Sequence, residues 1–82
     1  MERIIFYTKE NCPLCDNALA MLKLLQHDYP FEIEERDIYT NDAWLEQYQL
    51  QIPVVQFRGT ILNCEQISYQ ALEHTLCKTR ED

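Results

Sequence analysis

The spacing of hydrophobic residues in the first third of the chain predicts a strand followed by a helix. Residues 3–7 (RIIFY) are a short, nearly continuous apolar run, which is typical of a strand covered on both faces. From Pro13 onward, apolar residues recur every three or four positions, which predicts a helix ending near His27. These residues are Cys15, Ala18, Leu19, Leu22 and Leu25. Because proline is favoured at the first helical position, Cys12 should be the N-cap.

The middle of the chain predicts a second strand and a second, shorter helix. Residues 31–38 begin by alternating apolar and acidic side chains, as in a strand with one solvated face, at the edge of a sheet. Residues 40–51 predict a short helix capped by Thr40 or Asn41, because short polar side chains accept hydrogen bonds from the first helical turn.

The last third predicts a hairpin and a final helix. Residues 52–57 and 60–64 read as strands, and the dipeptide Arg58-Gly59 between them suits a tight hairpin turn. A helix is expected from about residue 65 to 78. Its apolar face is formed by Ile67, Ala71, Leu72 and Leu76.

This order of elements, β-α-β-α-β-β-α, predicts an α/β fold. Strands separated by helices favour parallel pairing with right-handed crossovers, and the closing hairpin adds antiparallel strands. We therefore expect a four-stranded mixed sheet with helices on both faces. The 82 residues suffice for a single domain, 1–82.

The composition narrows the classes of partner. The chain carries 14 acidic and 7 basic residues, a formal net charge of −7, whereas nucleic acids and anionic membranes attract basic surfaces. We therefore expect no nucleic-acid or membrane partner. The protein is also expected to be a monomer.

The start of the chain lacks the shape of a signal peptide and no run is long enough to span a membrane, so a cytoplasmic location is expected. Structural disulfides are rare there, so the four cysteines are free thiols, metal ligands or redox catalysts.

Two of these cysteines, Cys12 and Cys15, form a Cys-x-x-Cys motif between the first predicted strand and helix. As N-cap, the sulfur of Cys12 can accept hydrogen bonds from first-turn N–H groups, including that of Cys15. The helix dipole also favours a thiolate there, and Lys9 could add a nearby positive charge, whereas the acidic Asp16 would oppose it.

Cys15, inside the first turn, should be more buried and should remain a thiol. After Cys12 has attacked a substrate disulfide, Cys15 could attack the resulting mixed disulfide and close a Cys12–Cys15 bond. Pro13 would stiffen the segment between the sulfurs. The motif thus predicts a dithiol thiol–disulfide oxidoreductase with Cys12 as nucleophile and Cys15 as resolving thiol.

The segment TKENCPLC, together with IPVV about forty residues later, resembles the active site of glutaredoxins. The sequence Cys-Pro-Leu-Cys-Asp is similar to that of small bacterial glutaredoxin-like proteins, and the resemblance covers nearly the whole chain. It implies a thioredoxin fold. It also implies that Pro53 is a cis proline facing Cys12, and that Ile52 offers its backbone N–H and C=O to glutathione or an extended peptide. Lys9 would hold a glutathione carboxylate.

The chain also departs from the glutaredoxin pattern. Asn63-Cys64 stands where these proteins carry Gly-Gly, and Leu14 replaces the usual aromatic residue between the cysteines. Glu65 is the nearest candidate for the carboxylate that faces the amino end of the peptide. With Pro13, these residues complete the implied substrate or glutathione site. No bound cofactor is expected. The electron donor is either glutathione or a flavoprotein reductase, and the sequence does not decide between them. The substrates are expected to be protein or small-molecule disulfides, whose identity the sequence does not give.

Alternatives to the enzyme remain at this stage. One Cys-x-x-Cys could belong to a zinc or iron–sulfur module, although structural zinc sites usually need a second cysteine or histidine pair. The second alternative is a redox-inert thioredoxin-like module that only binds a partner, since the fold does not determine the function. Cys64 either forms a regulatory disulfide or a mixed adduct, or is a small buried or half-buried residue, and Cys77 is expected to be structural or incidental. No role is assigned to His27 or His74.

Overall fold

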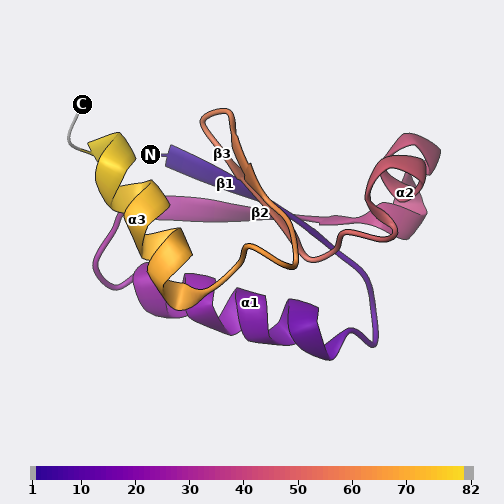
Figure 1. The fold of residues 1–82 in the computed structure, drawn as a ribbon, viewed down its shortest axis with the longest axis horizontal. Coiled ribbons are helices and arrows are strands. Elements are labelled where there is room, and N and C mark those ends of the chain that lie inside the picture. Colours follow the sequence, from indigo (N-terminus) through magenta and orange to yellow (C-terminus); the bar gives the residue numbers. More distant parts are fainter. Residues whose placement is uncertain (1, 81–82) are drawn as a thin grey trace.

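The computed structural model describes residues 2–80, which form four strands, three α-helices and one 3₁₀ turn (Figure 1). In chain order they are β1 (Glu2–Thr8), α1 (Pro13–Leu25), β2 (Phe31–Asp37), the 3₁₀ turn η1 (Ile38–Thr40), α2 (Asp42–Tyr48), β3 (Val54–Phe57), β4 (Thr60–Leu62) and α3 (Tyr69–Arg80). This order confirms the predicted β-α-β-α-β-β-α arrangement. Only the 3₁₀ turn was not anticipated.

The four strands form one mixed sheet in the order β2-β1-β3-β4. β1 and β2 are parallel, whereas β3 runs antiparallel to both β1 and β4. β2 lies at an edge, as its alternating pattern predicted. Tyr7 near the end of β1 pairs with Val54 at the start of β3. The segment after β1 and the segment before β3 therefore meet at the same end of the sheet, where α1 also begins (Figure 1).

Helices α1 and α3 cover one face of the sheet and contact each other (Figure 1). The apolar side of α1 is fully buried through Cys15, Ala18, Leu22 and Leu25, at the predicted helical spacing. Leu72 and Leu76 of α3 are buried in the same core. A fully buried leucine side chain contributes about 1.5–3 kcal/mol of transfer free energy, so this layer is a main source of stability.

Helix α2 packs against the opposite face. Side chains alternate along a strand, and Phe6 faces the α1 layer, so its neighbour Tyr7 points the other way. The ring of Tyr7 stacks on that of Tyr48 at 4.3 Å between centroids and meets Trp44 edge-on at 5.8 Å. The prediction of helices on both faces is thus confirmed.

The final helix begins later than predicted. The start near residue 65 is wrong: α3 begins at Tyr69, and residues 63–68 form a turn held by their own side chains. Asn63 Oδ1 accepts from the N–H of Glu65, and Gln66 Oε1 accepts from the N–H of Asn63. The hydroxyl of Ser68 accepts from the N–H of Ala71 at 3.0 Å and so caps the helix.

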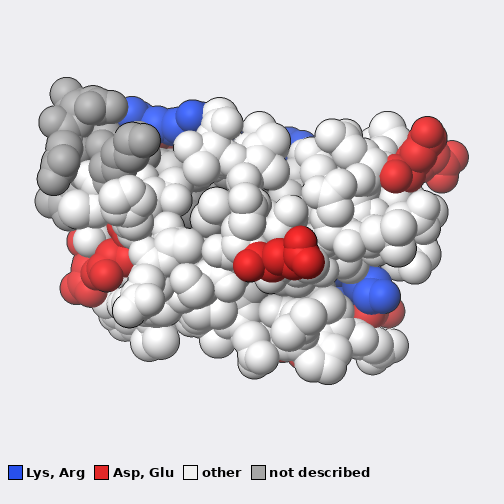
Figure 2. Space-filling view, in the orientation of Figure 1, with Lys and Arg blue, Asp and Glu red and all other residues white. Residues whose placement is uncertain are grey.

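The surface carries separated acidic side chains with few basic ones between them on the face seen in Figure 2, in keeping with the net charge of −7. In the described range 2–80, no helix combines the length and the apolar character needed to cross a bilayer.

Candidate active site

Cys12 and Cys15 are joined by a disulfide at the amino end of α1. Their Cα atoms lie 5.2 Å apart, as the helical turn between them requires. Pro13 occupies the first helical position and Cys12 is the N-cap with extended backbone angles, both as predicted. Asn11, just before the cap, adopts a positive φ of 55° and so turns the chain from β1 into the helix.

The sulfur of Cys12 sits where first-turn N–H groups point. It accepts a hydrogen bond from the N–H of Cys15 at 3.1 Å, which is the capping contact expected from the sequence. Cys12 is 8% exposed and Cys15 1%. The order of burial also agrees with the expectation that Cys15 is the more protected thiol.

The segment before β3 lies at the same end of the sheet. Pro53 is buried and follows a cis peptide bond, as the resemblance implied. The N–H of Ile52, which the resemblance assigns to a bound peptide, instead donates to the carbonyl of Tyr48 at 3.1 Å. The N–H of Cys64 donates to Gln51 at 3.0 Å. This loop is therefore tied to α2 on one side and to the segment after β4 on the other.

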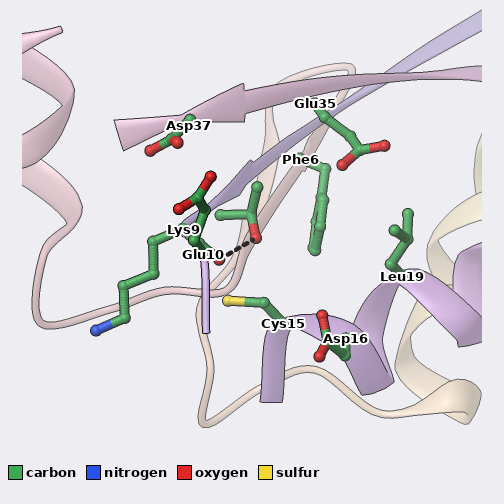
Figure 3. A pocket seen from close by; sticks show the side chains of 9 residues that line it. Phe6, Lys9, Glu10, Cys15, Asp16, Leu19, Glu35 and Asp37 are labelled. Carbon is green, nitrogen blue, oxygen red and sulfur yellow. Dashed lines mark hydrogen bonds between the residues drawn. The ribbon is translucent and has the colours of Figure 1, made fainter. Parts of the chain in front are cut away.

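A pocket of about 280 Å³ opens beside the disulfide (Figure 3). Cys15 forms part of its wall, together with Phe6 and Leu19. Its other lining residues come from the end of β1 and the loop after it, the first turn of α1 and the end of β2, and are polar or charged: Thr8, Lys9, Glu10, Asp16, Glu35 and Asp37. The hydroxyl of Thr8 donates to the carbonyl of Lys9 at 3.4 Å and helps to hold the loop.

The pocket is acidic in character. Lys9 is the one cation among its described lining residues, and its amine points away from the other labelled side chains in Figure 3. The sequence singled out Lys9 and Asp16 but missed Glu10, Glu35 and Asp37. The parallel β1–β2 pairing predicted from the element order could have placed Asp37 here, since Asp37 pairs with Thr8.

The remaining predicted site residues do not line the pocket. Leu14, between the cysteines, is 61% exposed. Glu65 is exposed and Cys64 half-buried. Cys77 is exposed on α3 and takes no part in the site. Among the side chains that the structure describes, no three metal-ligating residues gather into a site, so the metal-binding alternative gains no set of ligands.

A second polar cluster lies on the far face, between β1, β2 and α2. Arg36 donates to the hydroxyl of Tyr7 at 3.1 Å and lies 5.1 Å from the ring centre of Trp44. Its hydrogen bond to Glu34 lowers the pKa of that carboxyl, and the same bond raises the pKa of Arg36. Burial, and then the neighbouring Tyr7, raise the pKa of Tyr48. The cluster fastens α2 to the sheet.

Similar structures support this architecture. The structural-genomics target protein XcR50 from X. campestris superposes with a TM-score of 0.74 at 24% identity, over 92% of this chain and 96% of that one. Oxidised mitochondrial thioredoxin 3 from Saccharomyces cerevisiae superposes with a TM-score of 0.66 at 16% identity, over 94% of this chain and 77% of that one. A malarial protein superposes with a TM-score of 0.64 at 15% identity, over 94% of this chain and 93% of that one. At these identities the likeness concerns the fold alone, and it confirms a thioredoxin-like fold.

The sequence itself identifies the family. Residues 3–77, nearly the whole chain, match the family described as Glutaredoxin-like domain (DUF836). The match includes both cysteines of the disulfide. The chain therefore belongs to the family of glutaredoxin-like domains (DUF836).

Proposed function

We propose that this protein is a dithiol thiol–disulfide oxidoreductase in which Cys12 is the nucleophile and Cys15 the resolving thiol. The observation that carries the proposal is the Cys12–Cys15 disulfide at the amino end of α1. Cys12, the more exposed residue of the pair, caps the helix with its sulfur, where backbone N–H groups and the helix dipole stabilise a thiolate. The sulfur of the more buried residue, Cys15, lies within bonding distance of it.

The reaction proceeds by two thiol–disulfide exchanges. The Cys12 thiolate attacks one sulfur of a substrate disulfide, forms a mixed disulfide and expels the other substrate sulfur as a thiolate. Cys15 then loses its proton and attacks the sulfur of Cys12, which closes the Cys12–Cys15 bond and expels the second substrate thiolate. An electron pair passes from the protein to the substrate, and the protons of the two protein thiols end on the released thiols.

The oxidised protein must then be reduced by glutathione or by a flavoprotein reductase. A reducing compartment such as the cytoplasm would supply either one. Pro53 and Ile52 are proposed to flank the bound substrate, because the segment before β3 lies at the end of the sheet where α1 begins.

The test uses a neutral peptide whose only cysteine carries a thiopyridyl group. The reduced protein should release thiopyridone and then the free peptide thiol. Cys12→Ser should lose the fast release of both and leave only the slow reaction of ordinary thiols such as Cys77, whereas Cys15→Ser should release thiopyridone rapidly once and retain the peptide as a mixed disulfide, visible as added mass of the intact protein.

Cys77→Ser is the matched control, because Cys77 is exposed on α3 and lies outside the site. It should react like the unaltered protein. Equal residual activity of the Cys12→Ser and Cys15→Ser proteins would contradict the dithiol mechanism.

A further inference from the structure

The pocket beside the disulfide is bordered by carboxylates that no cation neutralises. Glu10, Asp16, Glu35 and Asp37 line it, and among the described side chains none of them forms an ion pair. Asp37 accepts a hydrogen bond from the N–H of Tyr39 at 2.9 Å, and the other three carboxylates are exposed at the rim. Like charges of this density in a concave site attract cations and repel anions.

The disulfide shares a wall with this pocket through Cys15. Cys12 does not itself line the pocket, but its sulfur is bonded to that of Cys15, which does, so exchange takes place close to the carboxylates. Charges on the substrate therefore interact with these carboxylates, both when the substrate approaches and in the mixed disulfide. Lys9 adds a single positive charge, and its amine points outward in Figure 3.

The main chain near Pro53 offers little to balance this repulsion. A ligand that adds as an extra strand needs free backbone donors and acceptors. The N–H of Ile52 is already bonded to Tyr48, and the carbonyl of Gln51 accepts from Cys64. Recognition in this conformation therefore depends mainly on side chains, and the charged side chains of the pocket are acidic apart from Lys9.

We propose that the site selects disulfides flanked by lysine or arginine in a polypeptide partner, and discriminates against anionic thiols such as glutathione. The proposal rests on the oxidoreductase function above and names its substrate class. Glutathione is a net anion at neutral pH, because its carboxylates outnumber its single amino group. A basic peptide places its cations beside the carboxylates as its disulfide reaches Cys12.

Exposed apolar side chains at the same end of the sheet favour a polypeptide over a small cation. Leu14 lies between the two cysteines, Tyr39 follows β2, and Leu50 lies in the loop that leads to Pro53. They are 61%, 65% and 91% exposed. Apolar side chains combined with a charged pocket are typical of surfaces that bind protein segments.

The experiment compares three thiopyridyl peptides of equal length whose cysteine is flanked by two lysines, two glutamines or two glutamates. The second-order rate constant of thiopyridone release is measured with the reduced protein at low ionic strength. The lysine peptide should react at least about tenfold faster than the glutamate peptide, with the glutamine peptide between them. At about 1 M salt, where the Debye length is ~3 Å, most of this difference should vanish.

A triple variant tests whether the pocket is the cause. Glu10→Gln, Asp16→Asn and Glu35→Gln remove three charges and keep side-chain shape, and Asp37 is left in place because it caps the 3₁₀ turn. The ratio of the lysine to the glutamate rate should fall severalfold. The control Asp28→Asn, Glu32→Gln, Glu46→Gln removes as many charges from residues that do not line the pocket, and should keep the ratio.

The outcomes separate this inference from the function on which it rests. If the glutamine peptide reacts in a Cys12-dependent manner but the lysine peptide is no faster than the glutamate peptide, the selectivity is wrong and the oxidoreductase stands. The same holds if both triple variants lower the ratio equally, since net charge alone then explains it. If no peptide reacts, both proposals fall.

Discussion

The N–H of Cys15 donates to the sulfur of Cys12 at 3.1 Å, so the proposed resolving residue also holds the proposed nucleophile in place. The contact comes from the backbone and is independent of the sulfur of Cys15. It should therefore persist in the Cys15→Ser protein. On reduction the same N–H would face a thiolate, and hydrogen bonds to a charged acceptor are stronger than those to a neutral one.

We therefore expect Cys12 to be the most reactive of the four cysteines in the reduced protein. In the reduced protein, the N–H of Cys15 and the helix dipole should favour the thiolate of Cys12, which is the reactive form. The measurement is the rate of alkylation by iodoacetamide against pH, with each site followed by peptide mass spectrometry.

Cys77 supplies the internal comparison for this experiment, since it is exposed but lies on α3, away from the amino end of α1. At neutral pH it should be alkylated more slowly than Cys12. A Cys12 that reacts no faster than Cys77 over the whole pH range would remove the basis for an activated nucleophile.

Asn41 fixes the start of α2, the helix whose last turn holds the loop before Pro53. Its side-chain oxygen accepts from the N–H groups of Ala43 and Trp44 at 2.9 and 3.2 Å. Asn41→Ala should lower the free energy of unfolding by about 1 kcal/mol, as is typical for a lost N-cap. Urea denaturation followed by the fluorescence of Trp44 measures it. Asn41→Asp keeps an acceptor and should cost clearly less, and equal losses would argue against capping.

The elements were predictable from the sequence wherever periodicity and a capping residue agree. At α1, the apolar spacing and Pro13 indicate the same start, and the structure begins the helix there. At α3 they disagree: Ile67 continues the helical spacing upstream, whereas Ser68 forms the cap. Local side-chain hydrogen bonds competed successfully with the helix over residues 63–68.

The site was only partly predictable, for a geometrical reason. Cys12, Cys15 and Pro13 lie within one turn, so their spacing alone specifies their relation. The carboxylates of Glu35 and Asp37 reach the pocket from another strand. Their position depends on the β1–β2 register and on where β2 ends. The bond from the N–H of Ile52 to Tyr48 likewise depends on how α2 ends.

Gly59 is the one glycine of the chain and is needed for the β3–β4 turn. It adopts a φ of +83° next to Arg58 at +49°, as a two-residue hairpin turn requires. A Cβ atom at Gly59 would meet nothing within 4 Å, so a substitution there changes only backbone conformational energy. Gly59→Ala should cost about 1–2 kcal/mol in urea denaturation. Asn tolerates this conformation better, so Gly59→Asn should cost less; an equal loss would contradict a backbone origin.

Tyr48 should make the stability of the fold sensitive to alkaline pH. Burial and the adjacent Tyr7 raise its pKa, so the folded state retains the phenolic proton longer than the unfolded chain does. Its stabilising contribution is complete below the unfolded value of about 10 and is lost as pH rises through the higher folded value. The free energy of unfolding should therefore decline above about pH 10.

Tyr48→Phe, which keeps the ring against Tyr7 but cannot ionise, should show a shallower decline in urea denaturation. Tyr69→Phe removes a tyrosine from the surface of α3 and should leave the slope unchanged; an unaltered slope in Tyr48→Phe would show that alkaline sensitivity arises elsewhere.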